Sequence, residues 1–553
     1  MTLAEQNYYW AEQIVCALRG CGAQHFFIAP GSRSAPLTLV LLRLAEVLPD
    51  VYCHTGFDER SLAFAALGVV KASGLPAVTV TSSGSAVANL LPAMVEAQQL
   101  QLPLVALTAD RPAYLIGVGA NQAIHQPGIF SHFVAFECSL PLPDGPLAAA
   151  GLQLSRHLHG SMRQQPGPVH LNVPFAEPLY PDSRLPLRAV PVSTAPAPAK
   201  LVRPANIIDV HGECLIIAGS LNIAQAQQVL KLAEALQAVV IADITSQLRQ
   251  LQHPRVLANS YELCTTEQPL LNQFKTVLQF GGRLVNKPVN QFLAQYPGCY
   301  WLINEHDQLL DPTGLAQCRR IPAAHWPLAF KQAGMATTTL QQQLIARSVD
   351  IAGHLAEQWQ RQYSEYHCLH LLSGLIPAEH LLFLGNSLTI RLYERTAECR
   401  ERYPEVFSNR GASGIDGLLA TAAGLQLARG QPLTVIVGDL SALHDLNSLY
   451  WLKQAGQTLV LIVLNNDGGQ IFSMLPARQQ KDVFEQGFEQ PHGISLAAIA
   501  AAMGLTSEQV AATEQLAEAY QKACRRAGAT VIEVLLPRDA FIRHHRALQC
   551  RPT

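Results

Sequence analysis

The chain has 553 residues, of which 49% are apolar and 14% are charged, and its formal net charge is −2. This composition is too apolar for a disordered chain, and the length predicts several domains. The near-neutral charge excludes a global field that would attract nucleic acid or an anionic membrane, so we expect small-molecule partners.

The cysteines and the N-terminal residues indicate in which compartment of the cell the protein is located. Twelve cysteines are scattered without a CxxC pair, and the first residues carry neither the basic region nor the apolar core of a secretory signal. The longest apolar runs, such as residues 459–464, are too short to span a bilayer. We therefore expect a reducing, cytoplasmic location and no membrane-embedded part.

Residues 1–182 alternate strand-like, loop and helix-like segments. Strands are predicted at 26–29, 77–81 and 104–108, with a helix over 86–99. Such alternation predicts a mainly parallel sheet flanked by helices. Residues 183–204 are rich in Pro and Ala without apolar periodicity, which is typical of a linker.

The rest of the chain repeats the α/β pattern twice. A central domain is predicted at 205–346 and a helical connection at 347–379. A third domain follows at 380–553, with strands at 381–384, 433–437, 458–464 and 530–535. Glycine and polar residues cluster after these strands, where ligands bind in open α/β sheets.

Two polar residues end neighbouring predicted strands of the third domain. Asp439 lies 27 residues before Asn466, about the length of a crossover between parallel strands. Mg²⁺ prefers oxygen ligands that it shares with phosphates, and a backbone carbonyl near Gly468 would complete the protein's share. Gly438 would let a phosphate approach the backbone, and the helix after Leu440 would offer free N–H groups. Taken singly, these residues are better explained as a helix cap and a turn, whereas together, at this spacing, they favour a metal and phosphate site.

A glutamate begins a strongly apolar helix in the first domain. Glu59 lies in the string HTGFDERS, next to Asp58, which we expect to cap the helix. A glutamate in the first turn of a helix often serves only to stabilise the helix, because its negative charge interacts favourably with the helix dipole.

The spacing of Gly438-Asp439 and Asn465-Asn466 resembles the motif of thiamine-diphosphate enzymes, although Leu440 replaces the final glycine of its GDG part. The resemblance implies thiamine diphosphate bound through Mg²⁺ (or Mn²⁺). In that family the cofactor lies between a pyrimidine-binding domain and a diphosphate-binding domain, which would be residues 1–182 and 380–553. Glu59 would then face N1′ of the aminopyrimidine from dry surroundings and so activate the thiazolium ring.

Longer strings resemble one family in particular, the 2-succinyl-5-enolpyruvyl-6-hydroxy-3-cyclohexene-1-carboxylate synthases of menaquinone and phylloquinone biosynthesis. The strings are FIAPGSRSAPL, HTGFDERS, TADRP, GANQAIHQPG, GNSLTIRL, SNRGASGIDG, VGDLSALHDLN and NNDGGQIFSMLP. The resemblance implies a three-domain α/β transferase. It would decarboxylate 2-oxoglutarate and add the resulting succinyl carbanion to isochorismate, releasing CO₂.

The same strings supply the implied site residues. Both substrates are dicarboxylates, which arginine binds in a bidentate manner. The substrate-facing set is Ser32, Arg33, Arg111, Gln122, Ser387, Arg391, Arg410 and Lys287, with Arg283 as a substitute for a basic residue that relatives carry where Pro288 stands. The cofactor set is Glu59, Gly438, Asp439, Leu440, Ser441, Asn466, Gly468, Ile415, Ile471 and Phe472, of which Ile415, Ile471 and Phe472 are equally explained as core.

The resemblance also implies a homodimer or homotetramer with active sites between subunits. Two other functions stay open from the residues alone. One is another thiamine-diphosphate enzyme, such as a 2-oxo acid decarboxylase or an acetohydroxyacid synthase, and the other is a non-catalytic binding protein that keeps the fold. A nicotinamide dehydrogenase and a P-loop hydrolase are disfavoured, because GxGxxG after a strand and GK are both missing.

Overall fold

The computed structural model describes residues 1–143, 151, 153–158, 160, 166–188, 207–306, 310–333, 338–397 and 403–549. Most of the predicted linker at 183–204 lies outside these residues. The described chain forms two compact units. Unit 1 draws on residues 1–199, 409–430 and 444–457, and unit 2 draws on 200–408, 431–443 and 458–553.

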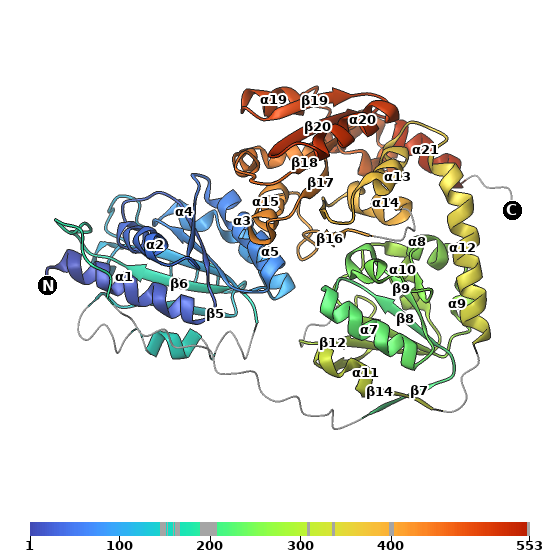
Figure 1. Ribbon diagram of the computed structural model, residues 1–553, viewed down its shortest axis with the longest axis horizontal. Helices are drawn as coiled ribbons and strands as arrows, with labels where there is room; N and C mark the ends of the chain where they lie inside the picture. The colour runs from blue at the N-terminus through green and yellow to red at the C-terminus, as the bar shows by residue number, and fades with distance from the viewer. Residues whose placement is uncertain are drawn as a thin grey trace. The chain divides into compact units, whose positions relative to one another are not determined.

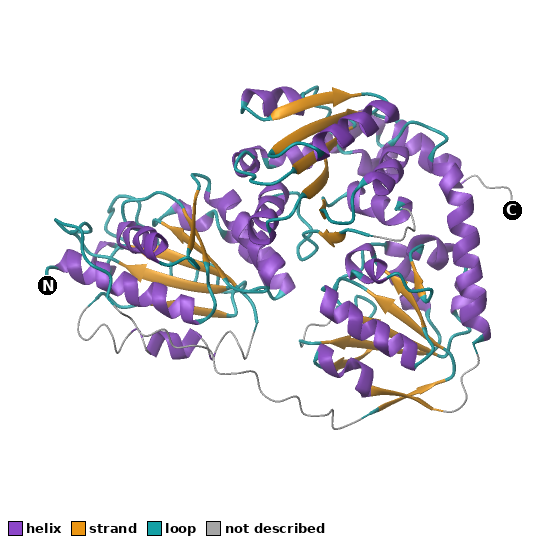
Figure 2. Ribbon diagram, in the orientation of Figure 1, coloured by secondary structure: helices purple, strands orange, loops and turns teal. Residues whose placement is uncertain are grey.

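Unit 1 is built on a six-stranded parallel sheet in the order β2-β1-β3-β4-β6-β5 (Figure 1, Figure 2). Its strands are β1 (His25–Ile28), β2 (Tyr52–Thr55), β3 (Ala77–Thr81), β4 (Leu104–Asp110), β5 (Phe136–Ser139) and β6 (Val169–Pro174). Its helices are α1 (Leu3–Gly20), α2 (Ala35–Val47), α3 (Glu59–Ser73), α4 (Ser85–Ala88), α5 (Leu91–Leu100), η1 (Ala113–Leu115), α15 (Leu418–Arg429), η5 (Leu446–Ser448) and α17 (Leu449–Leu452). The central strands β3 and β4 are buried throughout, as expected of a sheet covered on both faces.

The three strands predicted in this region are confirmed, but the single helix predicted over 86–99 is wrong. The structure has two helices there, α4 and α5, interrupted at Asn89 and Leu90. Pro92 explains the break, because proline has no N–H to donate and is favoured in the first turn of a helix.

Unit 2 begins with a second six-stranded parallel sheet, in the order β10-β9-β8-β11-β12-β13. Its strands are β8 (Cys214–Ala218), β9 (Val239–Ala242), β10 (Val256–Leu257), β11 (Thr276–Phe280), β12 (Cys299–Asn304) and β13 (Gln317–Arg320), and β7 (Ile208–His211) pairs separately with β14 (Phe330–Ala333). The accompanying helices are α7 (Ile223–Ala235), η2 (Ile244–Ser246), η3 (Leu248–Leu251), α8 (Ser260–Thr266), α9 (Gln268–Leu271), α10 (Lys287–Gln295), η4 (Ala323–His325), α11 (Trp326–Ala329) and α12 (Thr339–Trp359). The predicted boundary between residues 346 and 347 falls inside α12.

The middle sheet has the strand order of dinucleotide-binding folds, in which the ligand crevice opens where the order reverses. Here the order reverses between β8 and β11, where the loops that follow the two strands lie in close backbone contact. A Cβ atom added to Gly219 would lie 2.0 Å from the carbonyl oxygen of Gly282. The Asp243 carboxylate at the end of β9 accepts the N–H groups of Thr245 and Val285.

The third sheet, also parallel, has the order β16-β15-β17-β18-β20-β19. Counted along the chain, this is the same serial order as in the sheet of unit 1. The strands are β15 (Leu381–Leu384), β16 (Glu405–Phe407), β17 (Leu433–Gly438), β18 (Leu459–Asn465), β19 (Thr506–Val510) and β20 (Ala529–Leu535). The helices are α13 (Glu365–Leu375), α14 (Leu388–Thr396), α16 (Asp439–His444), η6 (Gln470–Met474), η7 (Pro476–Gln479), α18 (Lys481–Phe484), η8 (Glu485–Glu489), α19 (Leu496–Ala502), α20 (Thr513–Cys524) and α21 (Ala540–Gln549).

The four strands predicted in this region are confirmed, whereas β16 and β19 were not predicted. Both are edge strands, and β19 has the polar sequence TSEQV, which shows no apolar signal. Three domains, each a parallel sheet with helices, therefore match the predicted fold class. None of the helices described has the length and apolar character needed to cross a membrane.

Candidate cofactor and substrate site

Two adjacent strands of the third sheet bring Asp439 and Asn466 to the same edge. Strands β17 and β18 pair in parallel, with Gly438 opposite Leu464. Asp439 follows β17 directly, and Asn466 follows β18. The sequence spacing was therefore a correct indication that the two strands are neighbours.

Asp439 is buried and held by backbone from a distant segment. Its Oδ1 accepts the N–H of Leu440 at 2.7 Å, and its Oδ2 accepts the N–H of Gly468 at 2.8 Å. The Nε2 atom of His492 lies 3.2 Å from the same Oδ2. Burial raises the pKa of Asp439, and these hydrogen bonds oppose the rise. Because Gly468 follows the neighbouring strand, Asp439 does more than cap its own helix.

Asn466 presents one end of its amide to a buried carboxylate. Its Nδ2 donates to Oε1 of Glu365 at 2.6 Å, and within the described residues no hydrogen bond reaches its Oδ1. The pKa of Glu365 is raised to about 7, mainly because the carboxyl is buried. The nearby Asp439 adds to this rise, and the hydrogen bond from Asn466 opposes it. The free amide oxygen is the atom that a hard cation would use.

The glycines beside these residues have different roles. Gly468 has φ +132°, and a Cβ atom there would lie 2.2 Å from the carbonyl oxygen of Glu489, so only glycine fits. A Cβ atom on Gly438 would meet nothing within 4 Å, so there is open space beside its backbone.

These oxygen donors fit Mg²⁺ shared with a diphosphate. The described residues contain no group of three or more His, Cys, Asp or Glu side chains that would hold a metal ion by themselves. One carboxylate and one amide oxygen, beside open space, suit a cation whose remaining ligands come from phosphate and water. Leu440 and the buried Ser441 form the first turn of α16, whose N–H groups would face such a phosphate.

Glu59 lies in unit 1 as the first residue of α3. Asp58 is the N-cap and accepts the N–H of Arg60, as predicted. Segment 444–457 fixes the same turn, since Arg60 donates to the carbonyl of His444 and lies 3.7 Å from buried Asp445. The Glu59 carboxylate is only half-buried, with Asn89 at 3.4 Å. Unit 1 therefore fixes the backbone of Glu59 but does not itself provide the dry surroundings that we predicted.

Three of the implied substrate residues gather at the carboxyl ends of the unit 1 strands. Arg111 Nη1 donates to Ser83 Oγ, and Gln122 Nε2 donates to the Ser83 carbonyl at 2.8 Å. Burial lowers the pKa of Arg111, and the nearby Arg33 guanidinium lowers it further. The carboxylates of Asp110 and Glu177 oppose this lowering.

Arg33 is also partly committed to the fold. Its Nη1 donates to the carbonyl of Phe175, and its Nη2 pairs with Glu177 at 2.9 Å. Its buried Nε makes no hydrogen bond within the described residues, and two of the five guanidinium N–H donors are used by Phe175 and Glu177. The neighbouring Ser32 is exposed.

In unit 2, Ser387 and Arg391 lie at the start of α14. Ser387 has φ +67°, an unusual conformation for a non-glycine residue that is often found at functional sites. Arg391 Nη1 donates back to the Ser387 carbonyl at 2.6 Å, and burial lowers the pKa of Arg391. The helix is fixed by its other end, where Glu394 pairs with Arg249 at 2.8 Å.

Arg410 and Ile415 lie on the loop before α15, in unit 1. Glu96 of α5 holds this loop, because its carboxylate accepts the N–H groups of Gly411 and Ala412 at 2.9 and 2.5 Å. Arg410 is 9% exposed and Ile415 is half-buried. A cavity of about 250 Å³ adjoins the loop, lined by Phe64, Leu91, Pro92, Val95, Glu96, Asn409, Ala412, Gly414 and Asp416.

The remaining implied residues fall in two places: Ile471 and Phe472 lie just after Gly468, on η6, whereas Arg283 and Lys287 lie apart from the other implied residues, in the middle sheet's part of unit 2. Ile471 packs against the core of the third sheet, which supports its interpretation as core, and Phe472 lies 5.8 Å from the Phe488 ring. Arg283 and Lys287 are exposed on the segment after β11 of the middle sheet. Pro288 lies in the first turn of α10, so relatives' basic residue has no equivalent at that position.

Sequence reasoning missed several residues that shape these sites. Glu365 lies in the segment interpreted only as a helical connection, and His492 lies in a loop without a motif. Glu96 is a buried carboxylate on the largely apolar helix α5, and Glu394 is a buried carboxylate on α14, which also carries Arg391 and Arg395. An acidic residue on the buried face of a helix was the one available signal, because burial of a carboxylate is costly unless it is paired.

Comparison with known proteins assigns the class. The N-terminal thiamine pyrophosphate-binding domain of thiamine pyrophosphate enzymes matches residues 10–129, their middle domain matches 199–384, and their C-terminal thiamine pyrophosphate-binding domain matches 395–534. A benzoylformate decarboxylase structure from Polynucleobacter necessarius has a similar fold, with a TM-score of 0.70 at 16% identity over 96% of this chain and 99% of that one. The chain thus has the three-domain architecture of thiamine-diphosphate enzymes.

Full-length relatives narrow the assignment. A 2-succinyl-5-enolpyruvyl-6-hydroxy-3-cyclohexene-1-carboxylate synthase from Halorhodospira halophila is 39% identical, covering 98% of this chain and 97% of the relative. The synthase of that name from Shewanella loihica is also 39% identical, covering 97% and 96%. The chain belongs to this synthase family of thiamine-diphosphate-dependent transferases.

Proposed function

We propose that this protein decarboxylates 2-oxoglutarate and joins the product to isochorismate, giving 2-succinyl-5-enolpyruvyl-6-hydroxy-3-cyclohexene-1-carboxylate and CO₂ in quinone biosynthesis. The observation that carries the substrate assignment is the pair Arg33 and Arg111, which follow strands β1 and β4 at the same edge of one parallel sheet and whose charges interact. Such a pair is suited to carboxylates, and both proposed substrates are dicarboxylates.

Thiamine diphosphate, when bound, supplies the thiazolium chemistry by which a 2-oxo acid loses CO₂. Asp439, Asn466 and the Gly468 backbone would hold its diphosphate through Mg²⁺ or Mn²⁺. Glu59 would hold a proton at N1′ of the aminopyrimidine. Ile415 and Phe472 would line the ring systems.

The chain's remaining polar groups would bind and orient the substrates. The first set, from unit 1, comprises Ser32, Arg33, Arg111, Gln122 and Arg410. The second set, from unit 2, comprises Ser387 and Arg391, with Arg283 or Lys287 as a more distant contact. Each lies in a loop or first helical turn after a strand, where an open α/β sheet places its ligands.

We also propose a homodimer or homotetramer with active sites between subunits. The support is the half-buried Glu59 carboxylate: its turn is held rigidly by Arg60 and Asp445, yet part of its surface is left uncovered within unit 1. A second subunit would provide the dry environment that the activating carboxyl needs. The cytoplasm stays the expected location, and small molecules stay the expected partners.

Another thiamine-diphosphate decarboxylase or carboligase is the alternative function, and the experiment must separate the two. The purified chain is assayed with thiamine diphosphate and Mg²⁺ for isochorismate consumption that depends on 2-oxoglutarate, beside turnover of pyruvate alone. We expect consumption of isochorismate and negligible pyruvate turnover. Pyruvate turnover without isochorismate consumption would favour the alternative. Failure of thiamine diphosphate to bind in calorimetry would instead favour a non-catalytic protein.

A further inference from the structure

A buried carboxylate outside the family-like strings contacts the candidate metal site. Glu365 is the first residue of α13 and is 2% exposed. Its Oε1 accepts from Nδ2 of Asn466 at 2.6 Å, and its Oε2 is buried without a hydrogen bond within the described residues. A carboxylate that makes so few bonds in the interior is expensive to bury, so its retention calls for a role beyond folding.

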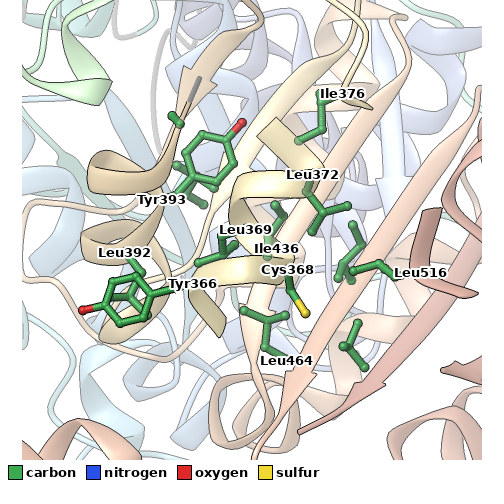
Figure 3. Packing of buried hydrophobic residues seen from close by; sticks show 14 of the residues in the cluster. Tyr366, Cys368, Leu369, Leu372, Ile376, Leu392, Tyr393, Ile436, Leu464 and Leu516 are labelled. Atoms are coloured by element: carbon green, nitrogen blue, oxygen red, sulfur yellow. The ribbon is translucent and has the colours of Figure 1, made fainter. Parts of the chain in front are cut away.

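The core of unit 2 fixes the position of this carboxylate. Figure 3 shows Leu369 and Leu372 of α13 packed beside Ile436 and Leu464, which belong to β17 and β18. These are the strands that end at Asp439 and Asn466. Because α13 lies against them, its first residue is set beside the loop that follows β18.

The two residues on either side of Glu365 are also anchored. Ser364 Oγ lies 2.6 Å from Nδ1 of His544, and the Tyr366 hydroxyl lies 2.7 Å from Nδ1 of His545. Glu365 lies between these two anchored residues. These contacts fix the backbone at Glu365, and burial of the side chain keeps its carboxylate on Asn466.

The orientation of the Asn466 amide decides whether it can serve a cation. An asparagine side chain can turn by 180° at χ2, and only one of the two orientations directs the oxygen toward the metal. A carboxylate acceptor binds the NH₂ group and leaves the oxygen on the opposite side. No hydrogen bond reaches that oxygen within the described residues.

We propose that Glu365 is a positioning residue for the divalent cation: by accepting from Asn466 Nδ2, it directs Asn466 Oδ1 toward the metal. This inference rests on the metal site proposed above. Partners that orient a metal ligand typically change metal affinity by about 10–100-fold when they are removed.

The experiment measures Mn²⁺ binding to the full chain with saturating thiamine diphosphate, from the free Mn²⁺ signal in electron paramagnetic resonance. Glu365→Met removes the acceptor, and we expect about a 10–100-fold weaker Kd. Glu365→Gln keeps an acceptor oxygen, and we expect a Kd within about threefold of the wild type. Equal losses in both variants would show that the negative charge acts at long range, and positioning would be refuted.

A swapped pair tests the hydrogen bond itself and does not depend on whether Glu365→Met folds. Asn466→Asp alone places two carboxylates in contact and should weaken Mn²⁺ binding by at least tenfold. Combined with Glu365→Gln, the donor and acceptor exchange places, the Asp oxygen is again directed outward, and affinity should return to within about threefold. Failure of the double variant to recover would overturn the proposal.

Two further variants separate the possible failures. Thr434→Val removes a buried hydroxyl that contacts His380 and Tyr520, so it lowers stability without touching the metal site, and its Kd should not change. Asp439→Ala should abolish Mn²⁺ binding. If Asp439→Ala loses the metal while Glu365→Met retains it, only the role of Glu365 is wrong. If Asp439→Ala also binds Mn²⁺ normally, the proposed metal site itself is wrong.

Discussion

The close crossing of α3 and α15 gives a prediction whose magnitude follows from the structure. A Cβ atom on Gly68 of α3 would lie 2.1 Å from the Thr421 carbonyl oxygen and 2.9 Å from the Cα atom of Gly424. Both neighbouring atoms are backbone, so no side chain can rotate away, and the helices must separate for Gly68→Ala to fit.

Two energies compete in this substitution. Alanine is favoured over glycine within a helix by about 1 kcal/mol. Overpacking a core costs roughly 1–3 kcal/mol, and contact with rigid backbone places Gly68 at the upper end. We therefore expect a net loss of about 2 kcal/mol. Since 1 kcal/mol shifts the midpoint of a domain of about 150–250 residues by roughly 2–4 °C, the melting temperature should fall by about 4–8 °C.

The assay is scanning calorimetry of the full chain, with Gly353→Ala as the matched control. Gly353 lies inside α12, and a Cβ atom there would meet nothing within 4 Å. The same substitution should therefore stabilise at this position, by up to about 1 kcal/mol. A Gly68→Ala variant that melts at or above the wild-type temperature would refute the packing argument.

The remaining predictions concern the site. Glu59→Gln should keep the fold but slow exchange of the thiazolium C2 proton with deuterium at least tenfold by NMR, because an amide cannot hold the proton at N1′. Mixing inactive Glu59→Gln with inactive Asp439→Ala should restore part of the activity after subunit exchange, if sites form between chains. Arg391→Ala and Arg410→Ala should each lower kcat/KM at least tenfold with little change in melting, since losing one partner of a buried charge pair costs about 2–5 kcal/mol. Burial, together with the nearby His25, lowers the pKa of His54 to about 4. In the unfolded chain the imidazole titrates near 6.5, so the contribution of neutral His54 to folding stability should be fully present above about pH 6.5. It should be lost as the pH drops toward 4, by at most about 1.4 kcal/mol per pH unit. In acid denaturation, His54→Gln should show a smaller loss of stability over this range.

Each of these has a control or a contradicting result. Arg395 lies one turn after Arg391 but pairs with Glu262 at 2.9 Å and stacks on Tyr261, so Arg395→Ala should lower the melting temperature instead of acting on kcat/KM alone. A fully active monomer in sedimentation would contradict the complementation prediction. Unchanged C2 exchange in Glu59→Gln would contradict its assignment. For His54, an equal loss of stability at acid pH in wild type and His54→Gln would show that other groups determine the pH dependence.

Local pattern was sufficient for much of this protein. Apolar runs such as 459–464 bounded by polar residues predict buried parallel strands, because a sheet covered on both faces needs apolar side chains on both. The spacing of Asp439 and Asn466 predicted adjacent strands, since a crossover has a minimum length. Asp58 was identified as a cap and Glu59 as the start of a helix, because those preferences arise within one helical turn.

Strand pairings and side-chain contacts between residues far apart in sequence were determined only by the tertiary structure. The edge strand β19 carries no apolar alternation, and only its pairing with β20 makes it a strand. Glu365 lies 101 residues from Asn466 and Glu96 lies 315 residues from Gly411, so no local pattern could pair them. The substrate arginines show the same division: sequence identified Arg33 and Arg111 by their residue type, but their proximity comes from strands β1 and β4 sharing one sheet. A carboxylate or guanidinium acquires its role from the groups that replace its water on burial, and folding determines which groups those are.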